Sequence, residues 1–437
     1  MVVSEGKLVT QAETEALRRQ LVARQRHALI PGELVEEKLA IPNIEPPPTP
    51  EEINSRYDRG EIRIVTEQAR YPLDSVSSLL ESGNYKLDPD YQRRHRWSRS
   101  QKSRLIESFI MNVPVPPIFL YEYDYNRYEV MDGLQRLTAV KEFYTNSFDL
   151  VGLEYWKELE GMTYSSLPSR IRDGISRRYL SSIVLLKETS HGEEDPEQLK
   201  RFVFGRINTG GVQLSHQEVR NALYDGPMNR KCKELAQTPE LRRLWGIPED
   251  VEKLVARAGR RHDPSEETLD SALDDLEPQE IPKSWREMTD VELVLRFFAN
   301  RQRMIVYREN IRGYLDDYLQ AANNYPRTTI EQLGSLFVDT TTLAEDVFGP
   351  RAFRRSRGTT WATVPSVSIY DAVMNVLSRL LQRANELISC REAIQVGMPG
   401  FYEEHSKVFN LRGQTRTDLM RREIEIESYL LGYINTQ

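Results

Sequence analysis

The clearest change of hydrophobic pattern along the chain lies around residue 130. Ile118–Tyr121 and Arg127–Met131 are two β-prone runs separated by a short polar segment, so they predict a β-hairpin. After it, apolar residues recur every three or four positions, at Leu134, Leu137, Val140, Phe143 and Tyr144. That spacing predicts one buried face of a helix. The pattern therefore predicts a strand that ends at Asp132, a turn at Gly133 and a helix directly behind it.

Weaker patterns predict further elements in the first half of the chain. Helices are expected at Thr10–His27, Leu73–Glu81 and Leu199–Ile207, short helical pieces at Tyr155–Tyr179, and strands at Ile62–Thr66 and Ser182–Leu186. Ser98 followed by Gln101, and Ser215 followed by Glu218, have the spacing of a capping box, in which two side chains satisfy the first backbone N–H groups of a helix. These two positions predict the starts of two helices.

The second half of the chain has helical periodicity and few turn signals. Its helical segments are Leu293–Phe298, Ile311–Ala322, Leu333–Val347, Tyr370–Ile388 and Leu419–Ile434. With strands confined to the first half, the expected fold class is α+β with a mainly α-helical C-terminal half. Five prolines between Pro42 and Pro50 predict an extended linker. The expected division is a helical arm and linker over residues 1–55, an α+β domain over 56–225 and a mainly helical domain over 226–437.

Composition narrows the class of protein. The 437 residues are 39% hydrophobic, which is enough for two or three packed parts. A net charge of −7 argues against a surface that binds nucleic acid all over, but leaves room for a local basic patch. The two cysteines, Cys232 and Cys390, exclude a disulfide framework and fit a reducing compartment. Because no apolar run approaches the length of a membrane span, the chain is expected to be cytoplasmic.

The predicted strand-to-helix junction carries candidate chemistry. Gly133 permits a tight turn, and the free backbone N–H groups of the following helical turn, with a solvent-facing Arg136 beside them, suit a phosphate group. Asp132 could then hold Mg²⁺ or orient a water, with Gln135 as a second catalytic candidate. The alternative is an ordinary strand-to-helix connection in which Asp132 caps the helix.

Two more polar groups lie near predicted helix starts. One is Tyr91-Gln92-Arg93 with Trp97-Ser98, and the other runs from Arg206 to Gly211 with Glu218, Arg220 and Asn221 behind it. If the three groups converge, they form a nucleotide phosphate site. Its binding residues would be Arg93, Gly133, Arg206, Asn208, Gly210 and Gly211. The alternatives are a solvated face for the basic residues, and helix capping with a surface ion pair for Glu218 and Arg220.

The most basic stretch of the chain surrounds Arg93. It contains Arg93, Arg94, His95, Arg96, Arg99, Lys102 and Arg104. Arg94, Arg96, Arg99 and Lys102 are the candidate contacts to DNA phosphates, and such binding would weaken with added salt as counterions are released.

Taken in order, these motifs resemble a known family. Tyr91-Gln92-Arg93, Trp97-Ser98, the segment Leu105 to Ser108, Pro116-Pro117-Ile118, Asp132 to Arg136 and the segment Phe204 to Asn221 are similar to the N-terminal domain of GmrSD-type restriction endonucleases. This is domain of unknown function 262, which is related to the ParB and sulfiredoxin fold. The resemblance covers roughly residues 70 to 225.

The resemblance implies a ParB/sulfiredoxin-like domain that binds a nucleoside triphosphate in prokaryotic defence against foreign DNA, and it leaves open whether the nucleotide is hydrolysed. The family motif is Asp-Gly-Gln-Gln-Arg. This chain has Leu134 in place of the first Gln, whereas Asp132, Gly133, Gln135 and Arg136 match. Two-domain relatives add a His-Asn-His nuclease, and no such motif is found in this sequence, where the six histidines are scattered.

The favoured interpretation is thus a nucleotide-binding component of DNA defence that uses Mg²⁺ and senses DNA or modified DNA. In a rival interpretation the same pocket is a non-enzymatic DNA-binding or partner-binding module, and the helical half docks a partner nuclease. A third is a DNA nickase that uses the ParB-like domain itself. A homo-oligomer is compatible with each interpretation.

Overall fold

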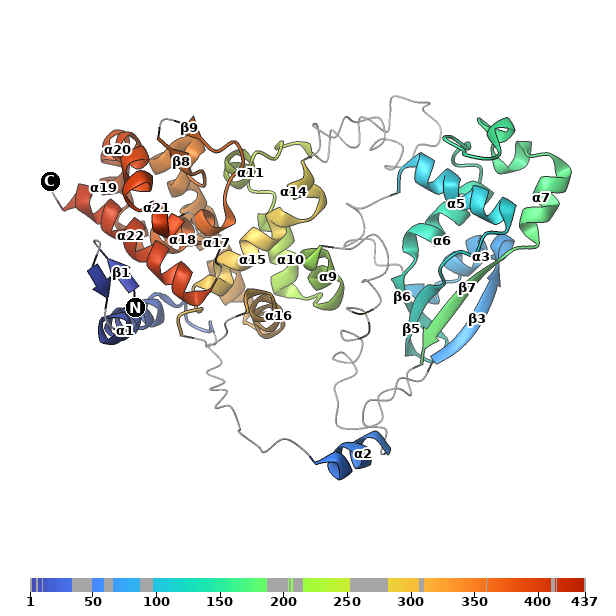
Figure 1. Ribbon diagram of the computed structural model, residues 1–437, viewed down its shortest axis with the longest axis horizontal. Coiled ribbons are helices and arrows are strands. Elements are labelled where there is room, and N and C mark those ends of the chain that lie inside the picture. The colour runs from blue at the N-terminus through green and yellow to red at the C-terminus, as the bar shows by residue number, and fades with distance from the viewer. Residues whose placement is uncertain are drawn as a thin grey trace. The chain divides into compact units, whose positions relative to one another are not determined.

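The computed structural model describes residues 2–4, 7–9, 11–33, 49–58, 66–86, 97–186, 203, 206, 215–251, 282–305, 310–358, 360–409, 413 and 415–435. The chain divides into two compact units (Figure 1). The sheet unit comprises Ile44–Leu223 and Asp250–Ile281, and the helical unit comprises Met1–Asn43, Tyr224–Glu249 and Pro282–Gln437. Each unit is described separately below.

The sheet unit is built on five strands. They are β3 (Thr66–Pro72), β4 (Tyr85–Lys86), β5 (Ile118–Asp124), β6 (Arg127–Asp132) and β7 (Tyr179–Leu185). Their order across the sheet is β3-β7-β5-β6-β4. The pairs β3–β7 and β5–β6 are antiparallel, and the pairs β5–β7 and β4–β6 are parallel. The sheet is therefore mixed, and β5 and β6 form the hairpin predicted from the sequence.

The helices that contribute to the larger core cluster cover one face of this sheet. The helical elements of the unit are α2 (Pro50–Asp58), η1 (Leu73–Ser75), α3 (Val76–Glu81), α5 (Arg99–Met111), α6 (Leu134–Tyr144), η2 (Lys157–Leu159), η3 (Tyr164–Ser166), α7 (Ser169–Ser176) and α9 (His216–Leu223). One core cluster joins Leu120 and Val130 of the sheet to Ile106 of α5 and Phe143 of α6. Because strand residues alternate between the two faces, Phe119 and Met131 belong to a second, smaller cluster.

The helical unit is built around a largely apolar core. Its elements are β1 (Val2–Ser4), β2 (Lys7–Val9), α1 (Gln11–Ala28), α10 (Pro227–Leu235), α11 (Pro239–Trp245), α14 (Lys283–Arg286), α15 (Thr289–Asn300), α16 (Ile311–Ala322), α17 (Arg327–Phe348), η5 (Gly349–Arg351), β8 (Ser356–Arg357), β9 (Thr360–Trp361), α18 (Val367–Leu380), η6 (Leu381–Arg383), α19 (Ala384–Ser389), α20 (Arg391–Glu404), α21 (Ser406–Phe409) and α22 (Arg416–Ile434). Phe297, Phe298 and Phe337 contact one another in this core. Arg296 and Asp371 form a buried ion pair that joins α15 to α18.

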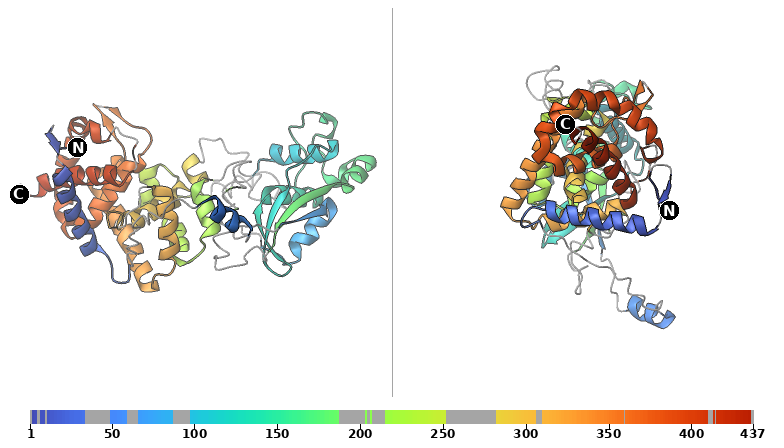
Figure 2. Two further views of the ribbon diagram at one scale, coloured as in Figure 1. Left: turned by 60° about the horizontal axis from the view of Figure 1, so that its bottom comes forward. Right: turned by 90° about the vertical axis from the view of Figure 1, so that its left-hand side faces the viewer.

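Helix α1 packs against the helical unit (Figure 2). The Gln25 side chain donates from Nε2 to the Asn300 carbonyl at 3.1 Å and accepts at Oε1 from the Met304 backbone N–H at 3.0 Å. Arg301 pairs with the buried carboxylate of Glu33 at 3.0 Å. These contacts fix the N-terminal segment onto the end of α15. The domain boundaries expected at residues 55 and 225 stay predictions.

The structure confirms the α+β class and the mainly helical second half. It also confirms the capping boxes of Ser98 with Gln101 and Ser215 with Glu218. The predicted helical segment Tyr370–Ile388 is interrupted, because η6 separates α18 from α19. The predicted strand at residues 62–66 and helix at residues 199–207 lie outside the described residues, except for residues 66, 203 and 206.

No helix in the described part of the chain has the length and apolar character that a membrane span needs.

Candidate functional site

The turn between β6 and α6 requires glycine. Gly133 has φ +94°, a conformation that disfavours residues with a Cβ atom. A Cβ added at Gly133 would lie 2.4 Å from Cγ2 of Ile118, which is fully buried in β5. Both the backbone conformation and the lack of space therefore select glycine, and this turn directs α6 away from the end of the strand.

The described residues supply no side-chain cap at the N-terminus of α6. Gly133, which has no side chain, stands at the N-cap position, and its carbonyl accepts the Leu137 backbone N–H at 3.0 Å. The first backbone N–H groups of a helix have no partner within the helix, and together with the helix dipole they attract anions. The expectation that Asp132 caps α6 is wrong, because its carboxylate is turned toward Arg136.

Asp132 and Arg136 form an ion pair at this junction. Arg136 Nη2 lies 2.5 Å from Asp132 Oδ2 and also donates to the Pro117 carbonyl at 3.2 Å. The Arg136 side chain is 13% exposed, whereas that of Asp132 is 36% exposed. The prediction of a solvent-facing Arg136 is therefore wrong. Its side chain is folded back over the start of the hairpin, which holds the guanidinium in one position.

Gln135 connects the starts of two helices. Its Oε1 accepts the backbone N–H of Trp97 at 3.2 Å, directly before the capping box of Ser98 that begins α5. An amide oxygen is too weak a base to take a proton from a water, although its second lone pair can still accept a hydrogen bond. The structure thus supports a positioning role for Gln135, which places the N-terminus of α5 beside that of α6.

Two candidate DNA contacts on α5 are already engaged within the protein. Lys102 Nζ pairs with Glu142 at 3.0 Å and lies 5.9 Å from the ring centre of Phe148, and the side chain is only 5% exposed. Arg99 pairs with Asp149 and keeps 32% of its side chain exposed. A DNA phosphate could reach Arg99, but it could reach Lys102 only by displacing Glu142. Lys102 is therefore removed from the candidate DNA surface.

Most of the other candidates lie outside the described residues. These are Arg93, Arg94, Arg96, Asn208, Gly210 and Gly211. Arg206 is described and is exposed. Hence the convergence of the three polar groups on one pocket stays a prediction.

Helix α9 carries buried polar residues. Glu218 completes the capping box, as one alternative from the sequence predicted. Arg220 is not a surface residue, because it is 2% exposed and donates to Gln217 Oε1 at 3.2 Å. Gln217 in turn donates to Asn221 Oδ1 at 3.0 Å. Gln217, which connects Arg220 to Asn221, is not among the candidates that the sequence suggested. The available signal was spacing, because Gln217 precedes Arg220 by three residues and Asn221 by four on the same helix.

The sequence analysis also overlooked the role of Glu107 on α5. The buried Glu107 carboxylate accepts three consecutive backbone N–H groups, from Glu154 at 3.1 Å, Tyr155 at 2.7 Å and Trp156 at 2.9 Å. Burial alone would raise the pKa of Glu107. The three backbone N–H groups and Arg104 lower it by more than burial raises it, so the pKa of Glu107 lies below its usual value. No sequence pattern could have shown this, because the partners are backbone atoms almost fifty residues away.

The role of Asp132 as a magnesium ligand stays a prediction. Among the described residues, no group of three His, Cys, Asp or Glu side chains could hold a metal ion. Magnesium in phosphate-binding proteins, however, often takes one or two carboxylates and fills its other positions with phosphate oxygens and waters. Asp132 is partly exposed, and its ion pair with Arg136 uses Oδ2.

The segment that contains this junction matches a known protein family. Residues 76–224 match the family model of the GmrSD restriction endonuclease N-terminal domain. These residues belong to that family. The matched range begins at α3, contains α5, the β5–β6 hairpin, the Gly133 turn and α6, and ends just after α9. It covers roughly a third of the chain. Comparisons with curated proteins and with solved structures find no match.

Proposed function

We propose that the chain is a nucleotide-binding component of a prokaryotic restriction system, and that the start of α6 binds the phosphates of a nucleoside triphosphate. The observation that carries this proposal is the uncapped N-terminus of α6 beside a fixed arginine, within a domain of a restriction endonuclease family. An anion at this position would gain the α6 backbone N–H groups and the helix dipole.

Each residue of the junction then has a separate role. Gly133 forms the tight turn that places the first backbone N–H groups of α6 at the end of β6, in a conformation that other residues rarely adopt. The Asp132 carboxylate and the Pro117 carbonyl hold the Arg136 guanidinium in place, which reduces the entropy lost when it binds phosphate oxygens. Asp132 would hold Mg²⁺ against the same phosphates, where the ion neutralises their charge. Gln135 keeps the start of α5 next to this site.

The first test measures nucleotide binding by the purified full chain. Each nucleoside triphosphate is titrated with Mg²⁺, and turnover is assayed with and without DNA. Arg136→Lys keeps the charge but removes the planar guanidinium that contacts both Asp132 and Pro117, so the nucleotide Kd is expected to rise about tenfold. Asp132→Asn should abolish the Mg²⁺ dependence of binding. Arg127→Lys, at the opposite end of β6, is the matched control and should leave the Kd unchanged.

The nucleotide proposal is contradicted if Arg136→Lys binds nucleotide as the wild-type chain does while both proteins show the same thermal unfolding. Binding that is lost equally in Arg127→Lys would also contradict it, because that variant keeps the charge and changes only a distant, exposed side chain.

A second candidate function is binding of the DNA backbone near α5. It is favoured by Arg104, whose side chain is 59% exposed, and by the exposed part of Arg99. Binding of a short duplex should weaken with rising salt, with a slope of about 0.9 per phosphate contacted. Arg104→Ala should reduce this slope by about one, and Lys283→Ala, an exposed lysine of the helical unit, should not. Fluorescence anisotropy at several salt concentrations measures both, and a salt-independent affinity would rule out this function.

A further inference from the structure

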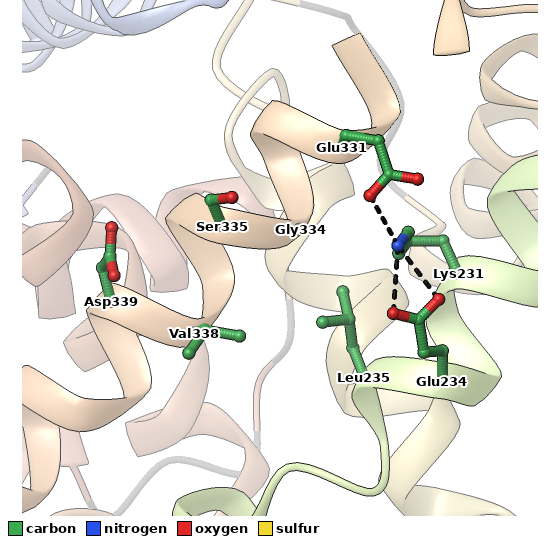
Figure 3. A pocket seen from close by; sticks show the side chains of 8 residues that line it. All are labelled: Lys231, Glu234, Leu235, Glu331, Gly334, Ser335, Val338 and Asp339. Atoms are coloured by element: carbon green, nitrogen blue, oxygen red, sulfur yellow. Dashed lines mark hydrogen bonds and ion pairs between the residues drawn. The ribbon is translucent and has the colours of Figure 1, made fainter. Parts of the chain in front are cut away.

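The exposed side of α17 in the helical unit carries a hollow next to α10 (Figure 3). Its volume is about 290 Å³, and it is lined by Lys231, Glu234, Leu235, Glu331, Gly334, Ser335, Val338 and Asp339. Gly334 is buried, and a Cβ there would lie 3.4 Å from Lys231 Cδ. Gly334 thus lies in van der Waals range of the side chains of α10 at the edge of the hollow.

A second hollow continues along the same helix. Its volume is about 340 Å³, and it is lined by Asp339, Thr342, Leu343 and Asp346 of α17, Leu381 of η6, and Ala384 and Ile388 of α19. The two hollows share Asp339, so they form one groove, here called the α17 groove. From Glu331 to Asp346 the groove follows about four turns of α17, a length of roughly 22 Å at 1.5 Å per residue.

The rim of the α17 groove is acidic. Its one cation, Lys231, lies between Glu331 at 2.8 Å and Glu234 at 2.9 Å (Figure 3), so its charge is already matched. Asp339 and Asp346 are exposed, and within the described part of the chain neither forms an ion pair. The groove therefore presents an unbalanced negative charge along its length.

Apolar side chains form part of the lining of the α17 groove. Val338 is 37% exposed in the first hollow. Leu381, Ala384 and Ile388 are half-buried along the second hollow. A partly apolar lining with acidic borders has the chemistry that complements an amphipathic segment with basic residues beside its apolar face.

We propose that the α17 groove binds an amphipathic helix, rich in Lys and Arg, of a partner protein. A groove between helices accepts the apolar face of another helix, and about four turns of α17 match a partner helix of about 15 residues. The basic side chains of that helix would contact Asp339 and Asp346 while its apolar face covers Val338. This inference does not depend on nucleotide binding by the sheet unit.

The test uses three synthetic 18-residue peptides and the full-length chain. The first is an amphipathic helix with leucines on one face and lysines on the other. The second has glutamates in place of the lysines, and the third has the lysine peptide's composition in a scrambled order that has no apolar face. Fluorescence anisotropy is expected to show saturable binding of the first peptide only.

Variants of the chain locate the binding and separate its two contributions. Asp339→Lys replaces an attraction with a repulsion and should weaken binding of the lysine peptide about tenfold. Val338→Ser leaves the charge unchanged and should weaken it about fivefold, because an apolar contact is lost. Glu403→Lys, an exposed residue near the end of α20 that lines neither hollow, makes the same change of charge as Asp339→Lys and should leave the affinity unchanged.

Three results would overturn the proposal. No binding of the lysine peptide by the wild-type chain would do so. Equal weakening by Asp339→Lys and Glu403→Lys would show attraction to the overall negative charge. A wild-type dimer in sedimentation that Val338→Ser dissociates would show that a second copy of this chain occupies the groove.

Discussion

Gly133→Ala is expected to lower the free energy of unfolding of the sheet unit by about 2–5 kcal/mol. A non-glycine residue in the left-handed region costs about 1–2 kcal/mol. The added Cβ would also lie 2.4 Å from Ile118 Cγ2 and 2.9 Å from Ile118 Cβ, in a fully buried part of the core. Overpacking of this kind typically costs a further 1–3 kcal/mol or so.

Gly83→Ala separates the two contributions. Gly83 also has a positive φ, +75°, but a Cβ there meets no atom within 4 Å. Its replacement should therefore cost only the backbone term, about 1–2 kcal/mol. Because the chain has two units, unfolding is best followed by denaturant-dependent hydrogen exchange in peptides from β5, β6 and α6. An equal loss of stability in the two variants would contradict the assigned clash with Ile118.

The Gly133 turn could be predicted from the sequence because its determinants are local. The hairpin follows from two alternating runs, and α6 follows from a change of period directly after Gly133. The capping box of Ser98 with Gln101 is also local, since both residues lie within one helical turn. Elements of this kind depend on residues close in sequence, and the structure confirms them.

The surroundings of the charged candidates could not be predicted in this way. Arg136 and Asp132 have a spacing that allows an ion pair, but Arg136 is buried because the Pro117 carbonyl lies above it, 19 residues earlier in the chain. Lys102 lies in the most basic stretch, yet Glu142 on α6 and Phe148 bury it. Side-chain burial is set by segments brought together by the fold, so a run of basic residues does not by itself define a surface.

In the helical unit, two helices that the sequence periodicity did not predict begin with proline. Helices α10 and α11 each begin with proline, Pro227 and Pro239, at the first helical position. Proline is favoured there because the N–H that it lacks would have no partner within the helix. The pairs Gly226-Pro227 and Thr238-Pro239 were thus usable start signals for helices that the periodicity alone did not reveal.

Glu107→Gln is expected to destabilise the loop that follows β6 and α6 by about 2–3 kcal/mol at neutral pH. Hydrogen bonds to a charged group contribute about 1.5–3 kcal/mol, and Glu107 accepts three of them from residues 154–156. Glutamine keeps one acceptor oxygen but turns an NH₂ group toward a backbone N–H, so at least one donor loses its partner. Hydrogen exchange in peptides from residues 149–161, combined with denaturant unfolding, measures the effect.

The matched control is Glu160→Gln. Glu160 accepts the backbone N–H groups of Gly152 at 3.1 Å and Leu153 at 2.7 Å in the same loop, but its side chain is exposed. Water can replace the lost acceptor at Glu160, so this substitution should cost at most about 1 kcal/mol. Equal effects of the two substitutions would show that the burial of Glu107 is not what makes its three bonds important.

The pH dependence of the Glu107→Gln effect is a second, independent test of whether the charge of Glu107 stabilises the loop. Burial raises the pKa of Glu107, and the three N–H groups and Arg104 lower it by more, so the folded pKa lies below the ordinary value of 4.5. Between these two pKa values the unfolded chain binds more protons than the folded chain. The contribution of Glu107 to stability is therefore complete above about pH 4.5, and it is lost as the pH falls through the pKa of the folded state. Glutamine does not titrate. The difference in stability between the wild-type chain and Glu107→Gln should therefore be largest at neutral pH and should shrink in acid. A difference that stays constant from pH 7 down to about 3 would mean that the charge of Glu107 does not hold the loop.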